Sequence, residues 1–272
     1  MTKFSVLLSV YKNEDPSFLN DALDSILVRQ SVLPDQVVVV KDGYLNDELD
    51  AVLMKYSELF KTIVIIIGYD INKGLGFALN FGLKYCSNEI IFRMDTDDIS
   101  VYNRFEIQLE AFFNYPYLSL IGSFIEEFEN TPGDLDRFRK VPVNLENIQL
   151  QKLNRNPFNH MTVGFKKSII DSVGGYEELP GYEDYYLWIK LLKEHSGFNI
   201  ETTLVHARVG NNMIGRRQGF EFFKKELAFQ KKILNDGFQS IGSFFKNFLL
   251  RCLPRLLPVK MLEFIYTNIL RN

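Results

Sequence analysis

The chain has 272 residues, 46% of them hydrophobic and 24% charged, which is the composition of a folded globular protein. The formal net charge of −3 argues against a uniformly basic nucleic-acid-binding protein, and we expect no nucleic-acid partner. Two cysteines are too few for a disulfide framework, which fits a reducing compartment. We expect neither a signal peptide nor a membrane-spanning helix, since no charge-free apolar run approaches about 20 residues.

Apolar runs and amphipathic segments alternate through the first half of the chain. Strands are expected at 4–10, 37–40, 63–67, 90–94 and 118–128, and helices from Pro16, near 49–56, at 75–85 and at 104–113. The strands lack polar alternation, which is typical of a parallel sheet that is covered by crossover helices on both faces. The sequence therefore predicts an α/β protein with a mostly parallel sheet flanked by helices.

The later part of the chain is punctuated by loops. The strongest loop signal, at 130–134, divides an expected domain at 1–239 into the halves 1–129 and 130–239. A short strand at 162–165 and a helix from Glu183 are expected in the second half. Residues 208–272 hold 12 Lys and Arg against 4 Asp and Glu. Segment 240–272 is therefore expected to form basic amphipathic helices, which either lie on an anionic membrane or pack on the domain.

Polar residues follow three of the predicted strands. They are Tyr11-Lys12-Asn13, Lys41-Asp42-Gly43 and Asp95-Thr96-Asp97. Because ligands bind outside the carboxyl ends of parallel strands, we expect all three to face one crevice. Gly74-Leu75-Gly76 does not complete a dinucleotide fingerprint, since Leu79 stands where a third glycine is needed. The turn Asn72-Lys73-Gly74 is expected instead to offer backbone N–H groups and Lys73 to a phosphate.

Two acidic groups have alternative interpretations. Asp95, Asp97 and Asp98 repel one another unless a cation lies among them, and Mg²⁺ or Mn²⁺ is the usual occupant; the alternative is an acidic cap on the following helix. Glu183-Asp184 begins a predicted helix, and its spacing alone favours stabilising charge at a helix N-terminus. His160, His195 and His206 are most simply interpreted as satisfied imidazoles.

Taken together, these segments resemble the family 2 glycosyltransferases, which have the GT-A, Rossmann-like fold. The resemblance covers residues 3–235 and is carried by the following residues: Ser5 to Lys12, Val37 to Gly43, Asn72 to Leu75, Met94 to Asp98, Gly174 to Tyr176 and Glu183 to Trp188. Lys41-Asp42-Gly43, Asn156 to Met161 and Arg216-Arg217 are similar to the amylovoran and O-antigen type within that family.

The resemblance implies roles for individual residues. Asp97 would bind a metal ion, Mn²⁺ or Mg²⁺, and Asp95 would lie near the ribose or the donor sugar. Asp42 would accept a hydrogen bond from the nucleobase, which Tyr11 would border. Asp184 would be the catalytic base, with Glu183 orienting the acceptor. Lys73, Arg216 and Arg217 would contact phosphates.

The resemblance also implies an activity: an inverting, metal-dependent hexosyltransferase with a nucleotide-binding half at 1–129 and an acceptor half at 130–239. Its donor would be a nucleotide sugar, and the resemblance implies that the nucleotide is UDP. Lys41 departs from the family here, because the commoner nucleobase motif has an acidic residue at this position. Its acceptor would be a lipid-linked oligosaccharide in O-antigen or surface polysaccharide synthesis, at the inner face of the cytoplasmic membrane. Two alternatives remain. A nucleotidyltransferase would need a more basic loop than the one from Tyr11 to Glu14. A non-catalytic nucleotide-sugar-binding protein would not need Asp184.

Overall fold

A computed structural model describes residues 2–210, 219–257 and 261. The chain divides into two compact units. The first contains residues up to Glu178 together with Glu183–Arg208, and the second contains Leu179–Tyr182 and the chain from Val209 onward. The division that we expected between residues 239 and 240 falls within the second unit and stays a prediction.

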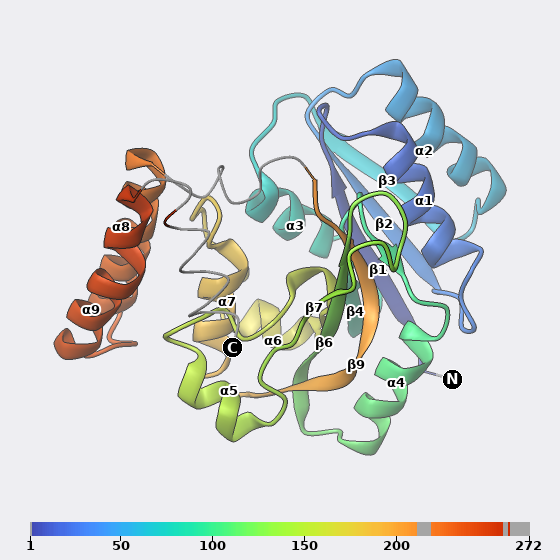
Figure 1. Ribbon diagram of the computed structural model, residues 1–272. Coiled ribbons are helices and arrows are strands. Elements are labelled where there is room, and N and C mark those ends of the chain that lie inside the picture. Colours follow the sequence, from blue (N-terminus) through green and yellow to red (C-terminus); the bar gives the residue numbers. More distant parts are fainter. Residues whose placement is uncertain (1, 211–218, 258–260, 262–272) are drawn as a thin grey trace. The chain divides into compact units, whose positions relative to one another are not determined.

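The first part of the sheet is built from four parallel strands in the order β3-β2-β1-β4 (Figure 1). Their bounds are β1 Phe4–Val10, β2 Gln36–Asp42, β3 Val64–Tyr69 and β4 Ile90–Arg93. The helices that connect them are α1 Pro16–Leu27, α2 Asp47–Leu59 and α3 Leu75–Leu83. These elements agree with the sequence prediction, apart from shifts of a few residues at their ends.

Helices cover both faces of this sheet because its strands are apolar on both sides. Val6 and Leu8 of β1 belong to a buried cluster with α1, α2 and α4 (Arg104–Asn114), whereas Leu7 belongs to a second cluster with α3 and α7 (Glu183–Leu191). Successive side chains of a strand point to opposite faces, so this division places two helical layers around one sheet. Figure 1 shows α3 on one side of the strands and α1 and α2 on the other.

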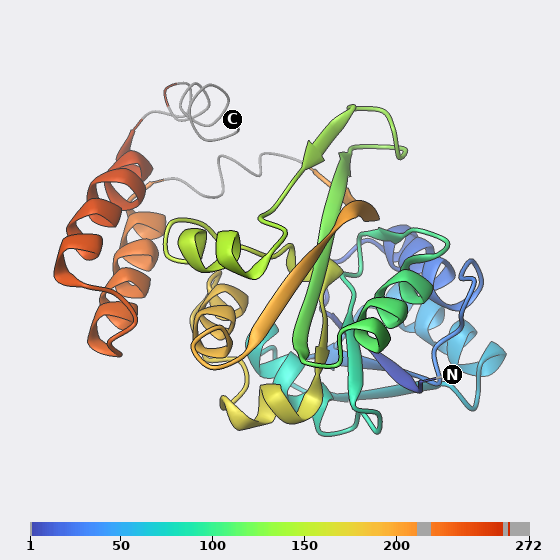
Figure 2. The ribbon, with the colours of Figure 1, turned by 90° about the horizontal axis from the view of Figure 1, so that it is seen from below.

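The second part of the sheet continues from β4 through β8, β6, β9 and β5. The bounds are β5 Ile99–Ser100, β6 Leu118–Phe128, β7 Arg137–Arg139, β8 Gly164–Lys166 and β9 Ser196–Arg208. β8 is antiparallel to β4 and to β6, and β5 is antiparallel to β9, while β6 and the long β9 run parallel side by side (Figure 2). The predicted α/β class with helices on both faces is confirmed, and the antiparallel pairs are confined to this half.

The strand β5 corrects one alternative for the acidic turn. Asp98 is followed directly by β5, and the next helix, α4, begins only at Arg104. The acidic residues therefore do not cap a helix. The remaining elements of the first unit are α5 Leu145–Gln151, a 3₁₀ turn at His160–Thr162 and α6 Lys167–Ser172.

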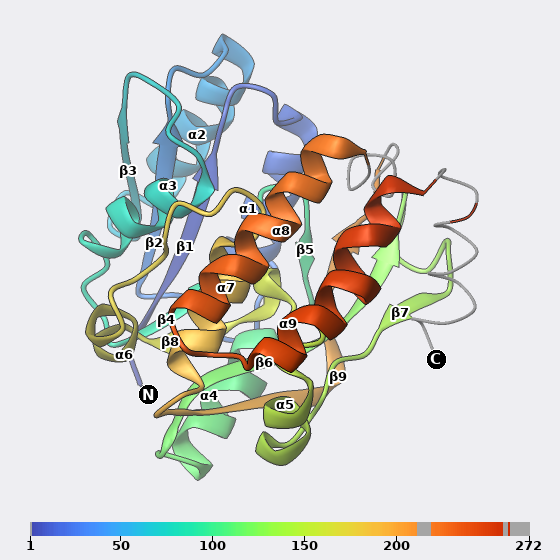
Figure 3. The same ribbon diagram turned by 90° about the vertical axis from the view of Figure 1, so that its left-hand side faces the viewer.

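The second unit is helical. It contains α8 Phe220–Asn235 and α9 Ile241–Asn247, which lie side by side (Figure 3), followed by a π-helical turn at Phe248–Cys252 and a 3₁₀ turn at Leu253–Leu256. This agrees with the helical spacing that the sequence shows from Ser240 onward. In the described part of the chain, no helix has the length and apolar character needed to cross a membrane.

Candidate active site

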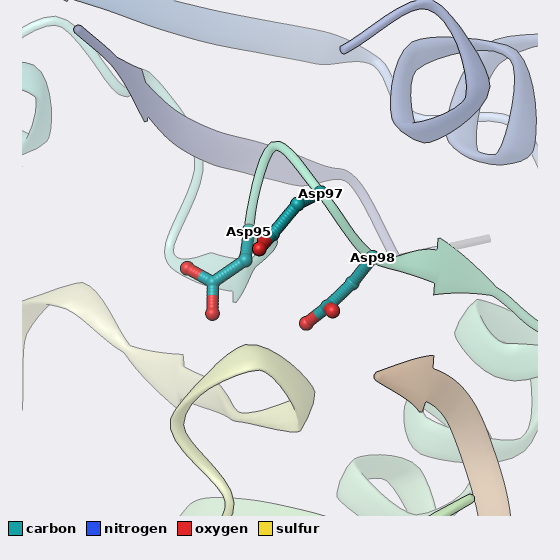
Figure 4. A group of neighbouring side chains, drawn as sticks. All are labelled: Asp95, Asp97 and Asp98. Atoms are coloured by element: carbon teal, nitrogen blue, oxygen red, sulfur yellow. The ribbon is translucent and has the colours of Figure 1, made fainter. Parts of the chain in front are cut away.

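The acidic turn directly follows the buried strand β4. One carboxylate oxygen from each of Asp95, Asp97 and Asp98 lies within 4.8 Å of the other two. Figure 4 shows the three side chains projecting from one turn of the chain toward the same side. Burial, together with the charge of Asp95, raises the pKa of Asp97 to about 6, and burial with the charge of Asp97 raises the pKa of Asp98 well above its usual range. The carboxylates are therefore held together against both desolvation and mutual repulsion.

Two arginines hold this turn in place. Arg93 at the end of β4 is 1% exposed and forms an ion pair with Asp95. Arg208 at the end of β9 donates its backbone N–H to Asp98 Oδ1 (2.8 Å) and its Nε–H to the Asp97 carbonyl (3.1 Å). The guanidinium of Arg208 lies between the rings of Phe18 and Phe128, 3.8 and 4.5 Å from their centroids. The turn is thus fixed by contacts from a strand about 110 residues later in the chain.

The donor atoms of the turn fit a divalent cation. Carboxylate oxygens are the ligands that Mg²⁺ and Mn²⁺ prefer. Asp98 Oδ2 is buried and has no hydrogen-bond partner among the described residues, so a bound cation would satisfy it. The three aspartates are the residues that would hold such an ion.

A fourth carboxylate, from Glu14, lies beside the turn, and the sequence analysis did not single it out. Burial raises the pKa of Glu14 to about 7, and the charges of Asp97 and Asp95 act in the same direction. The Thr96 hydroxyl donates a hydrogen bond to it. Its position in the sequence could have indicated this, because Glu14 is the last residue of the polar segment that follows β1.

Asp42 anchors the loop that follows β3. Its Oδ1 accepts hydrogen bonds from the Tyr69 hydroxyl (2.8 Å) and the Lys73 backbone N–H (2.7 Å). Its Oδ2 accepts from Asn72 Nδ2 (2.9 Å) and the Gly74 backbone N–H (3.0 Å). A nucleobase would therefore have to share or replace one of four existing contacts, and the expected contact between Asp42 and the base stays a prediction.

The loop anchored by Asp42 approaches the strand end closely. A Cβ at Gly43 would lie 2.7 Å from the Asn72 backbone nitrogen, and Gly43 has a φ of +86°, so only glycine fits there. Lys73 Nζ lies 4.4 Å from the centroid of the Phe77 ring. Tyr11 is 38% exposed at the same edge of the sheet, since β1 and β2 pair in parallel register up to Val10 and Lys41.

Asp184 lies in the first turn of α7. Its Oδ2 accepts a hydrogen bond from Asn156 Nδ2 (2.7 Å), and burial raises its pKa above the usual range. The neighbouring Glu183 lies against α3, because a Cβ on Gly76 would be 3.1 Å from Glu183 Cγ. The start of α7 is therefore next to the helix that begins at the Asn72-Lys73-Gly74 turn.

A buried polar cluster lies between the acidic turn and α7. His160 Nε2 lies 3.1 Å from the Tyr176 hydroxyl, and burial together with the charge of Arg93 keeps the pKa of His160 well below its usual range. Asn80 fixes the Tyr176 backbone through hydrogen bonds of 2.7 and 2.9 Å. This agrees with the interpretation of His160 as a satisfied imidazole. Arg216 and Arg217 lie outside the described residues.

Comparisons with known proteins show the family of this chain. Residues 5–223 match the family model described as Glycosyl transferase family 2. The chain is 37% identical over 271 residues to the UDP-Gal:alpha-D-GlcNAc-diphosphoundecaprenol beta-1,3-galactosyltransferase of Escherichia coli, covering 99% of this chain and 97% of that one. It is 35% identical to the amylovoran biosynthesis glycosyltransferase AmsE of Erwinia amylovora, with 97% of each chain covered.

Solved structures share the fold. S. aureus TarS 1-349 in complex with UDP-GlcNAc superposes with a TM-score of 0.67 at 20% identity, covering 98% of this chain and 74% of that one. The mannosyltransferase PcManGT from Pyrobaculum calidifontis, in complex with GDP-Man and Mn²⁺, gives 0.68 at 16% identity, covering 98% and 75%.

The α/β sheet of this chain has the GT-A fold of these solved structures, and an acidic turn follows strand β4. This chain belongs to glycosyltransferase family 2. The nucleotidyltransferase and the non-catalytic binding protein are thereby set aside.

Proposed function

We propose that the chain is an inverting, metal-dependent glycosyltransferase that moves a sugar from a UDP-linked donor to a lipid-linked glycan. The supporting observation is the environment of Tyr176. Burial raises the pKa of this phenol; Arg93 opposes that rise, and the charges of Asp184 and Asp95 add to it. Both carboxylates therefore lie within electrostatic range of one buried hydroxyl, so the acidic turn and Asp184 belong to the same region of the first unit.

The donor end of the site would be the acidic turn. Asp97 would hold a divalent ion, and Asp95 would lie near the ribose or the donor sugar. When bound, the ion would supply a Lewis acid for the departing diphosphate. Arg93 keeps the Asp95 carboxylate in place, and Arg208 fixes the backbone on which Asp97 and Asp98 sit. The backbone N–H groups of Lys73 and Gly74 are already used by Asp42, so the Lys73 ammonium is the more suitable phosphate contact.

The acceptor end would be Asp184. Its carboxylate would remove the proton from an acceptor hydroxyl while that oxygen attacks the anomeric carbon, and the bond from this carbon to the diphosphate oxygen would break. A buried carboxylate with a raised pKa is a stronger base than one in water. The hydrogen bond from Asn156 favours the ionised form and fixes its orientation.

The pH profile of an Asn156→Ala variant tests this arrangement. Because Asp184 must be ionised to act as a base, activity falls as the pH drops through its pKa. Removing the Asn156 donor takes away a contact that stabilises the carboxylate, so the pKa rises further and the acidic limb of kcat/KM moves to higher pH. On the alkaline plateau the loss should stay within roughly 10–100-fold, since a hydrogen bond to a charged group contributes about 1.5–3 kcal/mol.

The matched control is Asn147→Ala, at an exposed position in α5. Its profile should coincide with that of the unaltered enzyme. An Asn156→Ala profile that also coincides would mean that Asn156 does not act on the catalytic base.

The proposed substrates come from the relatives. The galactosyltransferase of Escherichia coli carries UDP-Gal and a diphosphoundecaprenol-linked acceptor in its name, and this chain is similar to it over nearly its whole length. We extend both substrate classes to this chain, with Mn²⁺ or Mg²⁺ as the metal. A lipid-linked acceptor would place the enzyme at the inner face of the cytoplasmic membrane, in peripheral contact through residues 240–272.

A donor panel tests the function. The full chain is incubated with Mn²⁺, a sugar-diphospho-lipid acceptor with a short, water-soluble chain, and in turn UDP-galactose, UDP-glucose, UDP-N-acetylglucosamine or GDP-mannose. Transfer from at least one UDP sugar is expected, detected as a mass increase of the acceptor. Transfer from GDP-mannose alone would contradict the UDP assignment, and no transfer from any donor would contradict the proposed function.

A further inference from the structure

The second unit has a polar interior. Glu226 of α8 is fully buried and forms ion pairs with Arg251 Nε (2.9 Å) and Arg255 Nη2 (3.3 Å). The Tyr182 hydroxyl donates a hydrogen bond to it (2.7 Å). Although burial alone would raise the pKa of Glu226, Arg251 and the Tyr182 hydroxyl hold it below its usual range. Two cations of the C-terminal segment are therefore turned inward.

Apolar side chains occupy the opposite side of the same segment. Ile241, Phe245 and Leu249 are 67%, 60% and 59% exposed, and they recur at intervals of four residues. We define the outward face as these residues together with others that share their exposure: Ile241, Phe245, Leu249, Leu250, Leu253 and Leu256. A helix that faces water carries its charges outside and its apolar residues inside. Here the arrangement is reversed.

This reversal changes what the sequence indicates about a membrane contact. The composition predicts a basic face, but Arg251 and Arg255 are used by Glu226. Of the cations between Ser240 and Leu257, Lys246 is the one at an exposed position, next to Phe245. The contact that remains is mainly apolar. Lys225 and Lys231 of α8 are also exposed.

We propose that the outward face inserts into the interface of an anionic phospholipid bilayer, with apolar burial rather than charge as the main source of binding. This inference rests on the proposed function, since a lipid-linked acceptor resides in such a bilayer. An anionic bilayer offers both an apolar layer for the leucines and a negative surface for the exposed Lys225, Lys231 and Lys246. A protein partner would have to supply both features in one surface.

Vesicle flotation of the full chain tests the proposal. The vesicles contain phosphatidylethanolamine and phosphatidylglycerol in equal parts. The unaltered chain should float with them, and binding should persist in roughly 0.5 M salt, where the screening length is only about 4 Å. The double variant Phe245→Glu with Leu249→Glu should bind at least about tenfold more weakly, since charged residues partition poorly into the bilayer.

The matched control is the double variant Met54→Glu with Ile71→Glu. It adds two negative charges at side chains of similar exposure, 60% and 73%, in the first unit. Its vesicle binding should equal that of the unaltered chain. Both variants should keep the unaltered thermal transition, which excludes loss of folding as the cause.

Three results would overturn the proposal. One is the absence of flotation, and another is binding that salt abolishes while the Phe245 and Leu249 substitutions leave it intact. The third is a dimer in solution that those substitutions dissociate, because the face would then pair with a second copy. The membrane proposal and the proposed activity can fail separately. Transfer to the water-soluble acceptor should be unchanged in the Phe245 and Leu249 variant. Loss of vesicle binding alone therefore leaves the proposed activity standing.

Discussion

Replacing Asp184 by Asn should lower the rate of sugar transfer by about 10²–10⁴-fold, the contribution of a general base. The amide has nearly the same shape as the carboxylate but cannot accept the acceptor's proton. Because the acidic turn is untouched, binding of UDP with Mn²⁺ should stay within a few-fold of that of the unaltered enzyme. Transfer is measured as the mass increase of the acceptor, and UDP binding by calorimetry.

Asp171→Asn is the control for this substitution, because it removes an exposed carboxylate near the end of α6. It should leave both transfer and UDP binding unchanged. Near-normal transfer by the Asp184→Asn variant would show that another group accepts the proton.

Replacing Asp97 by Asn should have opposite effects on stability with and without metal. Without a cation, the substitution relieves repulsion among buried carboxylates, so the thermal midpoint in EDTA should rise. With Mn²⁺ and UDP, the unaltered enzyme should gain stability by ligand binding while the variant gains much less. Transfer should fall at least roughly 10–100-fold, since replacing even a residue that only orients a metal ligand costs that much.

The control for this second substitution is Glu106→Gln, which removes one exposed negative charge from α4. It should show the ordinary gain in stability with Mn²⁺ and UDP. If the Asp97→Asn variant were stabilised by Mn²⁺ and UDP as strongly as the unaltered enzyme, the acidic turn would not be the metal site.

The sequence predicted those parts of the fold that depend on local patterns. The apolar runs at 4–10, 37–40 and 90–94 form parallel strands, and the acidic turn follows the last of them. A buried parallel strand needs apolar residues on both faces, so its signal is continuous and easily read. In the other half of the sheet, the strands at 118–128 and near 162–165 were predicted, but β5, β9 and the antiparallel pairing were not, because pairing between distant strands has no local signature.

The candidate site divides in the same way. Short sequence motifs contain Asp95, Asp97 and Asp184, and the resemblance to a known family indicated their roles. Glu14, Arg208 and Asn156 act through contacts with residues far away in the chain, such as the 2.7 Å hydrogen bond from Asn156 to Asp184. Their residue types are common in loops and strand ends, so only the folded arrangement indicates what each of them does.

The contacts of Asp42 show a further limit. The residue lies at the strand end where we expected it, but its four hydrogen bonds are to the chain itself. A sequence motif identifies a buried carboxylate at this place and does not distinguish a group that binds a nucleobase from one that shapes the loop around it.

The stereochemistry of the product tests the central claim most directly. In the donor panel, the new glycosidic bond is examined by nuclear magnetic resonance after transfer from a UDP sugar of α configuration. Direct displacement by an acceptor hydroxyl that Asp184 deprotonates inverts the anomeric carbon, so the product should be β-linked. An α-linked product would contradict the single displacement and, with it, the role that we propose for Asp184.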